Sequence, residues 1–486
     1  MRLSELFREV EFDGSIKNDA DINLVTDDSR LVRPGSLFVC IRHRSFDGHT
    51  AALDALASGA TAVVTQDRLG LENELRVADS RSAYARLCAA LCNHPERKLR
   101  MIGVTGTNGK TTVTTLIRNI LSDSGTKTLL TGTVCNRLGD ENLPSGLTTP
   151  KPPELYSLLS RAVSQRCKAC VMEASSQALA QGRLEGIDFD AAVFTNITRD
   201  HLDYHGTFEN YISAKKKLFE HSALSIVNLD DPRANEIIAA SKGKIITFST
   251  VLDCADYTAK NISLLSDCVR FELVSKGHIE HIEFASPGLF SVSNAMAAAV
   301  CAINLGIEPK DAAQSLAKSK SVCGRLERVE CSAPYSVIID YAHTPDGLEQ
   351  VLRALRPSCR GKLIVLFGCG GDRDRTKRPL MGAAACKYAD KIIVTSDNPR
   401  SEDPIKIIGD ILKGTDKKRR NLFVEPDRRK AIALALKTAE PGDTVLLAGK
   451  GHEKYQLIGG EKLPLDERET VRKILGLPHD TGRKKQ

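Results

Sequence analysis

The chain has 486 residues, too long for one ordinary hydrophobic core, and this length favours about three domains. Hydrophobic residues make up 42% and charged residues 27%, and Trp is absent, as is typical of a globular α/β protein. The formal net charge of +7 is modest for this length, and no stripe of Lys or Arg alternates with aromatic residues. We therefore expect no nucleic-acid partner, and an anionic small substrate explains the charge equally well.

The sequence predicts a cytoplasmic protein without stable membrane insertion. No secretory signal opens the chain, and no apolar run approaches the roughly 20 residues that a membrane-spanning helix needs. The 14 cysteines are dispersed, mostly within apolar stretches, where Cys acts as a small buried hydrophobic residue. Cys167 and Cys170 have the spacing of metal ligands, but no second pair completes a set of four, so we expect no zinc site.

The first block, residues 1–97, is expected to be a small α/β domain because short strands and helices alternate. It ends in a polar, proline-bearing linker at residues 93–97. The predicted elements are a helix at 3–10, a strand at 37–41, a helix at 54–58 and a strand at 60–64.

The second block, residues 98–327, is predicted to hold a mostly parallel sheet with helices on its faces. Residues 244–284 read instead as short alternating strands, and an Ala-rich helix follows at 292–305. The predicted parallel strands are 100–105, 169–172, 191–195 and 225–228.

The third block, residues 328–486, shows strands that each lead into a helical stretch, which predicts a doubly wound, Rossmann-like domain. Its predicted strands are 336–340, 363–367, 391–395 and 444–447.

A phosphate-binding loop is predicted where the strand 100–105 leads into a helix. Residues 106–111 read Gly-Thr-Asn-Gly-Lys-Thr, a close variant of G-x-x-x-x-G-K-[ST] in which Val104 stands at the first glycine position. Glycines allow backbone N–H groups to face phosphate oxygens, and a helix N-terminus adds partial positive charge. Lys110 would pair with the β- and γ-phosphates, and Thr111 would bind Mg²⁺.

Carboxylates for a magnesium–nucleotide site are expected at the ends of the following strands. Glu173 ends one strand, and a polar cluster at residues 195–203 ends the next. Either would alone be a capping turn more often than a site. Glu173 and this polar cluster both lie at the ends of strands in the block that carries the phosphate loop, and this shared position favours a functional site.

Many further segments, in order over nearly the whole chain, resemble the Mur ligases, most closely the diaminopimelate-adding members. So many ordered matches are far more specific than the phosphate loop alone. The resemblance implies a three-domain architecture with a central P-loop parallel-sheet domain and a Rossmann-like C-terminal domain. The matching segments are 28–30, 34–35, 106–112, 148–150, 173–183, 200–206, 214–215, 323–325, 340–345, 370–374, 397–400 and 449–453.

The resemblance implies an ATP-dependent ligase of peptidoglycan precursor synthesis. In that family ATP phosphorylates a substrate carboxylate, and an incoming amine attacks the acyl-phosphate. Each step gathers negative charge, which Mg²⁺ and a lysine stabilise. The implied catalytic residues are Lys110, Glu173, His201 and Lys215, with Thr111, Glu173 and His201 on the metal. Lys215 matches a lysine carried as a carbamate, although Lys215-Lys216-Lys217 alone looks like a solvated helix face.

The same resemblance assigns the substrates, which are ATP, a UDP-N-acetylmuramoyl-dipeptide and meso-diaminopimelate. The implied ATP-binding residues are Gly106, Thr107, Asn108, Gly109, Lys110, Thr111, Thr112, Asn294 and Arg325, with Asp340 and His343 at the same end or the domain junction. The implied precursor-binding residues are Ser29, Ser45, Thr148, Thr149, Ser175, Gln181 and Arg183. The implied diaminopimelate-binding residues are Arg373, Asp397, Asn398, Pro399, Arg400, Gly449 and Glu453.

Arg400 separates the alternatives, because an arginine can clamp the distal carboxylate of diaminopimelate, and lysine-adding relatives lack it. Gln177 and Leu147 depart from the family pattern, which has His and Asn there. An L-lysine-adding or folate ligase, a P-loop ATPase switch and an inactive binding module remain as alternatives. We expect a monomer in which domain motion brings nucleotide and amino acid together.

Overall fold

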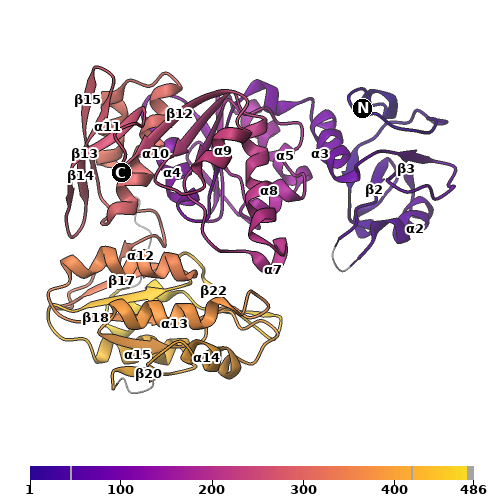
Figure 1. Ribbon diagram of the computed structural model, residues 1–486. Helices are drawn as coiled ribbons and strands as arrows, with labels where there is room; N and C mark the ends of the chain where they lie inside the picture. Colours follow the sequence, from indigo (N-terminus) through magenta and orange to yellow (C-terminus); the bar gives the residue numbers. More distant parts are fainter. Residues whose placement is uncertain (44–45, 417–419, 479–486) are drawn as a thin grey trace.

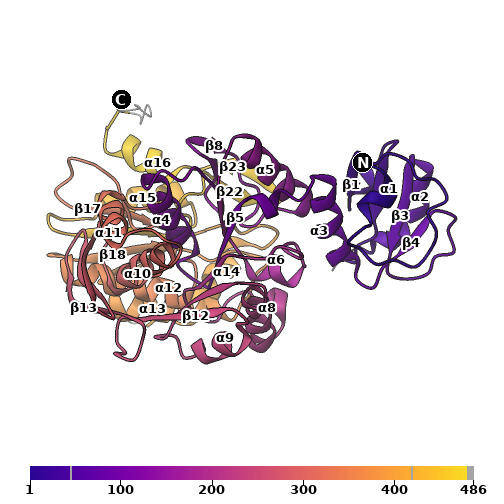
Figure 2. The ribbon, with the colours of Figure 1, turned by 90° about the horizontal axis from the view of Figure 1, so that it is seen from above.

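The computed structural model describes residues 1–43, 46–416 and 420–478. Three α/β units follow one another along the chain, each built around its own sheet (Figure 1). Seen from above, the first unit extends to one side and meets the second through helix α3 (Figure 2). The α/β class and the three-part architecture predicted from the sequence are confirmed.

The first unit is a parallel sheet of four strands in the order β1-β2-β3-β4. Helix α3 (Ser80–Leu91) packs both on this unit and on α5 (Pro152–Ser164) of the second, so one apolar core continues across the junction. The predicted helix at 3–10 is shorter than expected. The other elements are α1 (Leu3–Leu6), β1 (Leu24–Thr26), η1 (Ser29–Leu31), β2 (Ser36–Val39), η2 (Gly48–Ala51), α2 (Ala52–Ala57), β3 (Ala60–Thr65), β4 (Glu74–Arg76) and η3 (Pro95–Lys98).

The central sheet has the order β15-β14-β13-β12-β11-β10-β5-β9-β6-β7-β8. Neighbours from β12 to β6 pair in parallel, as expected. Alternate residues of one strand enter different cores, Ile102 joining the core under α4 and Met101 the opposite one. Burial on both faces explains why these strands read as continuous apolar runs.

Antiparallel pairing extends both edges of the central sheet, from β13 through β15 and from β6 through β8, whereas β12, which opens the alternating segment predicted at 244–284, pairs in parallel with β11 and β13. The strands of this unit are β5 (Arg100–Thr105), β6 (Thr128–Thr131), β7 (Asn136–Leu138), β8 (Glu141–Leu143), β9 (Ala169–Glu173), β10 (Ala191–Phe194), β11 (Leu224–Asn228), β12 (Lys244–Ser249), β13 (Tyr257–Leu264), β14 (Val269–Ser275) and β15 (His278–Phe284). Its remaining helices are α4 (Lys110–Asp123), α6 (Ser176–Ala180), α7 (Leu202–His205), α8 (Phe208–Glu220), α9 (Ala234–Ala240), α10 (Leu289–Asn304) and α11 (Pro309–Lys318).

The third unit is a six-stranded sheet, β16-β17-β21-β18-β19-β20, with a core on each face. Among the described strands of this sheet, β16 pairs antiparallel with β17, and all other neighbouring strands pair in parallel. Its strands are β16 (Glu327–Arg328), β17 (Ser336–Asp340), β18 (Leu363–Phe367), β19 (Lys391–Val394), β20 (Leu422–Val424) and β21 (Thr444–Ala448), with a separate hairpin of β22 (Tyr455–Ile458) and β23 (Glu461–Pro464). Its helices are α12 (Pro345–Leu355), η4 (Arg356–Ser358), α13 (Lys377–Tyr388), α14 (Pro404–Leu412), α15 (Arg428–Lys437) and α16 (Glu467–Ile474).

The predicted boundary after residue 327 falls inside β16, whose two residues pair with β17 of the third sheet. The segment joining the second and third units therefore lies between α11, which ends at Lys318, and β16. It carries Arg325, one of the predicted site residues.

Candidate active site

The predicted phosphate loop lies between the carboxyl end of β5 and the N-terminus of α4. Gly109 has a φ of +89°, in the region that favours glycine. At Gly106 a Cβ would lie 1.9 Å from Thr195 Oγ1, so the loop packs tightly on the end of β10. The Asn108 N–H donates to Asn196 Oδ1 at 2.9 Å, which fixes the loop from the same side.

Lys110 folds back over this loop. Its ammonium group donates to the carbonyl oxygens of Gly106 at 2.7 Å and Thr107 at 3.0 Å. Desolvation lowers the pKa of Lys110, and the nearby Glu173 and Asp200 act in the opposite direction. A cation held at a helix N-terminus beside glycine backbone is suited to phosphate oxygens.

Glu173 ends β9 and is buried beneath the phosphate loop, with 1% of its surface exposed. Its Oε2 accepts hydrogen bonds from the hydroxyls of Thr111 at 3.0 Å and Thr133 at 2.9 Å. Its Oε1 accepts the Thr133 N–H at 2.7 Å. The Thr133 hydroxyl also donates to Thr148 Oγ1 at 3.0 Å, and Arg325 Nη2 donates to Thr111 Oγ1 at 3.1 Å.

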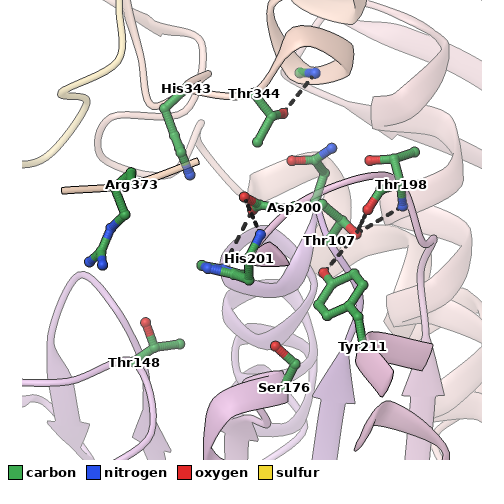
Figure 3. A network of polar contacts seen from close by, with 12 residues as sticks. Thr107, Thr148, Ser176, Thr198, Asp200, His201, Tyr211, His343, Thr344 and Arg373 are labelled. Carbon is green, nitrogen blue, oxygen red and sulfur yellow. Dashed lines mark hydrogen bonds and ion pairs between the residues drawn. The ribbon is translucent and has the colours of Figure 1, made fainter. Parts of the chain in front are cut away.

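His201 and Asp200 lie side by side at the start of α7, with 3.5 Å between His201 Nε2 and Asp200 Oδ2. Burial lowers the pKa of His201 to about 4, so its imidazole is neutral at pH 7. His343 of the third unit points toward this pair, and Thr148 and Ser176 lie across the opening from Arg373 (Figure 3). A pocket of about 120 Å³ is lined by Glu173, His201 and His343 together with Thr148 and Ser176.

Lys215 is buried on α8 with 1% of its surface exposed, so the solvated helix face suggested by the three consecutive lysines is wrong for this residue. Its Nζ donates to the Gly106 carbonyl at 2.8 Å and lies 4.7 Å from the centre of the Tyr211 ring. Among the residues that the structure describes, no carboxylate lies within ion-pair distance of it. Burial, with the positive charge of Lys110, holds the pKa of Lys215 well below its usual value.

A larger cavity of about 330 Å³ adjoins the phosphate loop, between the second and third units. Asn294 of α10 and Arg325 both line it, as do Asn108, Gly109 and Thr112 of the loop region. Its lining contains Phe and Leu side chains as well as amide groups, and it would take a flat, largely apolar ring system.

The residues predicted to bind the nucleotide precursor fall into two places. Thr149 lies in the second unit beside Ser175, whose Oγ accepts its hydroxyl at 3.0 Å. Arg183 donates to the Thr149 carbonyl at 2.7 Å and to Gln181 Oε1 at 2.9 Å, and burial lowers the pKa of Arg183. Gln181 and Arg183 line a small pocket at the first unit together with His43 and Arg81.

Ser29 lies in η1 of the first unit and is half-buried. Ser45 lies outside the described residues. Of the two departures from the family pattern, Leu147 is 43% exposed, and Gln177 lines a pocket of about 470 Å³ together with Arg373.

The third unit brings a second polar cluster together at the ends of β19 and β21. Lys450 donates to Asn398 Oδ1 at 3.0 Å and to Glu453 Oε2 at 2.8 Å, and Asn398 Nδ2 also donates to Glu453 Oε2 at 2.9 Å. Asp397 lies 3.9 Å from Lys450. Burial raises the pKa of Asp397, but Lys450 and other cations outweigh it and leave that pKa lowered. At Gly449 a Cβ would lie 2.5 Å from Asp397 Oδ2.

Arg373 and Arg400 approach each other across the backbone of Gly370. A Cβ at Gly370 would lie 2.8 Å from Arg400 Nη1 and 3.8 Å from Arg373 Cγ. Arg400 Nη1 donates to the Gly371 carbonyl at 2.7 Å, and Arg373 Nη1 lies 3.6 Å from Asp203 Oδ2 of the second unit. Both guanidinium groups thus lie near the junction of the second and third units.

Polar contacts from the third unit reach the phosphate loop and its neighbours. Asn108 Nδ2 donates to Asp346 Oδ2 at 3.1 Å, and Arg199 Nη2 donates to Thr376 Oγ1 at 3.0 Å. The Arg325 guanidinium lies 4.8 Å from the centre of the Tyr341 ring. The third unit therefore contacts the phosphate loop and its neighbours directly.

Sequence reasoning missed several residues that hold this site together. Thr133 bonds to Glu173, Asn196 fixes the phosphate loop, and Lys450 pairs with the third-unit cluster. Lys450 stands inside a segment that carried the family resemblance, so its position was a signal. Thr133 carries no local signal, because it follows a short strand and meets Glu173 only through sheet order β9-β6.

Comparison with known proteins places these units in one family. Residues 21–90 match the family model described as "Mur ligase family, catalytic domain". Residues 104–302 match the model described as "Mur ligase middle domain". Residues 324–451 match the model described as "Mur ligase, glutamate ligase domain". A UDP-N-acetylmuramoyl-L-alanyl-D-glutamate--2,6-diaminopimelate ligase from Caldanaerobacter subterraneus subsp. tengcongensis is 43% identical over 98% of this chain and 99% of its own.

A second relative and a solved structure carry the same name. The one from Syntrophomonas wolfei subsp. wolfei is 42% identical over 98% of this chain and 99% of its own. A solved structure of such a ligase is 35% identical, with a TM-score of 0.71, over 98% of this chain and 99% of that one. Identity of this degree over almost the whole length, together with the matched units and the phosphate-loop site, shows that the chain belongs to the Mur ligase family.

Proposed function

We propose that the chain is an ATP-dependent ligase that joins meso-diaminopimelate to UDP-N-acetylmuramoyl-L-alanyl-D-glutamate in peptidoglycan precursor synthesis. The relatives with 43% and 42% identity are named for this reaction. Apart from Ser29 and Ser45, the site residues named from the sequence belong to the second and third units. The precursor and ATP would meet in the second unit, and the third would present the amino acid.

One set of hydrogen bonds carries this proposal. It runs from Arg325 to Thr111, then through Glu173 to Thr133 and Thr148. The set joins residues assigned to ATP with residues assigned to the precursor. A phosphoryl group can pass between two substrates only if they are held within bonding distance. A continuous chain of hydrogen bonds between the two sets of residues supports their binding side by side.

In the proposed reaction a carboxylate oxygen of the precursor attacks the γ-phosphorus of ATP, forming an acyl-phosphate and releasing ADP. The neutral amine of diaminopimelate then attacks the acyl carbon, an amide bond forms, and inorganic phosphate leaves. Lys110, at the N-terminus of α4, would stabilise the charge on the phosphoryl oxygens throughout. The backbone of residues 106–109 would hold the phosphates in line.

Mg²⁺ would be held by Thr111, Glu173 and His201. Glu173 Oε2 and Thr111 Oγ1 lie 3.0 Å apart, and Mg²⁺ in nucleotide sites takes one or two carboxylates with phosphate oxygens. The neutral imidazole of His201 has a free lone pair for a cation, in keeping with its lowered pKa. When bound, the ion supplies positive charge to the phosphoryl oxygens.

We assign Lys215 as the modified residue. An amine must be neutral to capture CO₂, and the lowered pKa of Lys215 supports this. Its buried position beside the Gly106 carbonyl puts the resulting anion next to the phosphate loop, where a second Mg²⁺ could be bound.

For the amino acid, Asp397, Asn398, Gly449 and Glu453 would bind the amino-acid head and its ammonium, beside Pro399. Arg373 and Arg400 would clamp the distal carboxylate of diaminopimelate, because two guanidinium groups near one backbone position suit a bidentate anion. For the precursor, Arg183, Gln181 and the hydroxyls at 148, 149 and 175 would hold the muramoyl-dipeptide, and Ser29 and Ser45 the uridine side.

The test measures phosphate release from ATP and Mg²⁺ with the UDP-muramoyl-dipeptide and either meso-diaminopimelate or L-lysine. We expect release only with diaminopimelate, and its loss in Arg400→Ala. Arg353→Ala is the control, since Arg353 is exposed on α12 of the same unit. Equal stimulation by lysine would identify a lysine-adding ligase, and turnover without precursor or amine would favour an ATPase switch.

None of the described helices is long and apolar enough to cross a membrane. Cytoplasmic location and a monomeric state stay predictions from the sequence, and fractionation and mass measurement in solution test them.

A further inference from the structure

Two loops of the third unit carry the two arginines assigned to the distal carboxylate. Residues 368–376 follow β18 and carry Arg373, and residues 395–403 follow β19 and carry Arg400. A clamp built from two guanidinium groups depends on the distance and angle between these loops. Neither arginine can set that geometry for the other, because both belong to the clamp itself.

The backbones of the two loops touch directly. The Gly371 N–H donates to the Asn398 carbonyl at 2.9 Å, and a Cβ at Gly371 would lie 1.9 Å from the Pro399 carbonyl oxygen. Arg400 Nη1 donates to the Gly371 carbonyl at 2.7 Å. The first loop therefore orients the guanidinium group of the second.

A buried ion pair between Arg378 and Glu402 also joins the two loops. Arg378, with 1% of its side chain exposed, donates from Nη2 to Glu402 Oε1 at 2.8 Å and from Nη1 to Glu402 Oε2 at 3.1 Å. Glu402 Oε1 also accepts the Asp372 N–H at 2.7 Å, and Arg378 Nη2 lies 3.4 Å from the Gly370 carbonyl. A second carboxylate, Asp410, accepts from Arg378 Nη1 at 3.1 Å.

The chemistry of the pair explains why both partners are needed. The planar fork of Arg378 reaches both oxygens of Glu402 and one carbonyl of the first loop, which a lysine cannot do. Glu402 belongs to the second loop and holds a backbone N–H of the first. The backbone beside Arg373 is thereby held to the loop that carries Arg400.

We propose that Glu402 and Arg378 are positioning residues that fix the spacing of Arg373 and Arg400 and so select an amino acid with a second carboxylate. This inference rests on the proposed function, since it assumes that the two arginines bind the distal carboxylate. Among the described residues, no hydrogen bond or ion pair joins Glu402 or Arg378 to the phosphate loop or to the precursor-binding residues.

The test compares Glu402→Gln with Asp410→Asn. Each removes the charge of one carboxylate that Arg378 contacts, but only Glu402 bonds to a loop that carries a clamp arginine. We expect Glu402→Gln to raise the KM for meso-diaminopimelate roughly tenfold, comparable to losing the outer hydrogen-bond partner of a metal ligand. The KM values for ATP and precursor stay unchanged, and the preference for diaminopimelate over L-lysine falls. Asp410→Asn keeps the wild-type preference.

Arg378→Lys keeps the charge but not the fork, and we expect the same loss of preference. Thermal unfolding of each variant, with ATP binding measured separately, shows whether it is folded. A preference unchanged in folded Glu402→Gln, or all three KM values rising together, would overturn this inference alone. A wild-type enzyme without preference for diaminopimelate would overturn the proposed function and this inference with it.

Discussion

Two buried lysines in this molecule have opposite surroundings. Lys215 of the second unit is 1% exposed and donates to backbone and hydroxyl oxygens, with no carboxylate of the described residues within ion-pair distance. Lys450 of the third unit is also fully buried, but Glu453 lies at 2.8 Å and Asp397 at 3.9 Å. Burial alone therefore does not decide what a lysine does.

The difference matches the proposed roles of the two sites. An unpaired buried amine has its pKa lowered and is available as a neutral nucleophile. A buried amine with two carboxylates is instead a fixed part of a charged network, which suits binding of a zwitterionic amino acid. Under the proposed function, the same side chain would serve chemistry in one unit and recognition in the other.

The largest expected effect concerns activity. Lys215→Met should lower kcat by roughly 10²–10³, the loss typical of removing one preorganised electrostatic group. Lys217→Met is the control, because Lys217 lies on the same helix and is exposed. Ligation assays with all three substrates measure both, and a Lys215→Met enzyme as active as wild type would remove Lys215 from the mechanism.

For the free energy of unfolding we expect the reverse order, with the larger loss on replacing Lys450 and the smaller on replacing Lys215. Lys450→Met leaves Glu453 and Asp397 without their cation, and we expect the free energy of unfolding to fall by about 3 kcal/mol, as for a broken buried ion pair. Lys215→Met leaves no carboxylate unpaired, so its free energy of unfolding should stay the same or rise. Urea denaturation compares the two, and an equal loss in both would refute the distinction.

The loop that accepts the Lys215 hydrogen bond should be intolerant of a side chain. Gly109→Ala must adopt a φ of +89° and place its Cβ 2.5 Å from Asn294 Oδ1. Gly125→Ala, at the other end of the same helix, shares the positive φ of +83° but has open space. We expect Gly125→Ala to cost about 1–2 kcal/mol of stability from backbone strain alone.

Gly109→Ala should cost more than that and also weaken ATP binding, measured by calorimetry. Equal stability losses and unchanged ATP affinity would show that the loop can move away from Asn294.

The smallest change per step of the measurement is the pH dependence of stability, followed one pH unit at a time. In the folded protein the pKa of Lys215 is lowered, so between that value and its ordinary value of 10.5 the unfolded chain binds more protons. The stability of wild type relative to Lys215→Met therefore rises with pH, by at most about 1.4 kcal/mol per pH unit. Denaturation in CO₂-free buffer across pH 7 to 10 tests this, and a difference that falls with pH would contradict it.

Features of the fold and of the candidate site that depend on a contiguous segment could be predicted from the sequence. The phosphate loop is a contiguous segment after an apolar strand, and the eight parallel strands predicted with bounds in the second and third units agree with the structure within one residue, whereas β6 and β20 were not predicted. Continuous apolar runs identify strands buried on both faces, and helix starts follow them.

Lys215 shows where local reading failed. Three consecutive lysines suggest a solvated face, yet Tyr211, Lys215 and Leu218 recur at helical spacing and all are buried. That periodicity was the available signal, and the neighbouring charges obscured it. The first helix is also shorter than predicted, residues 3–6 rather than 3–10.

The sequence by itself determined the family, the main parallel strands and the candidate site residues, because each depends on neighbours along the chain. The tertiary structure alone decided which of them meet. Arg325 reaches Thr111 across 214 positions, and Arg378 joins Glu402 across 24. Such pairs depend on how sheets order their strands and how units pack, and hydrophobic periodicity does not encode either.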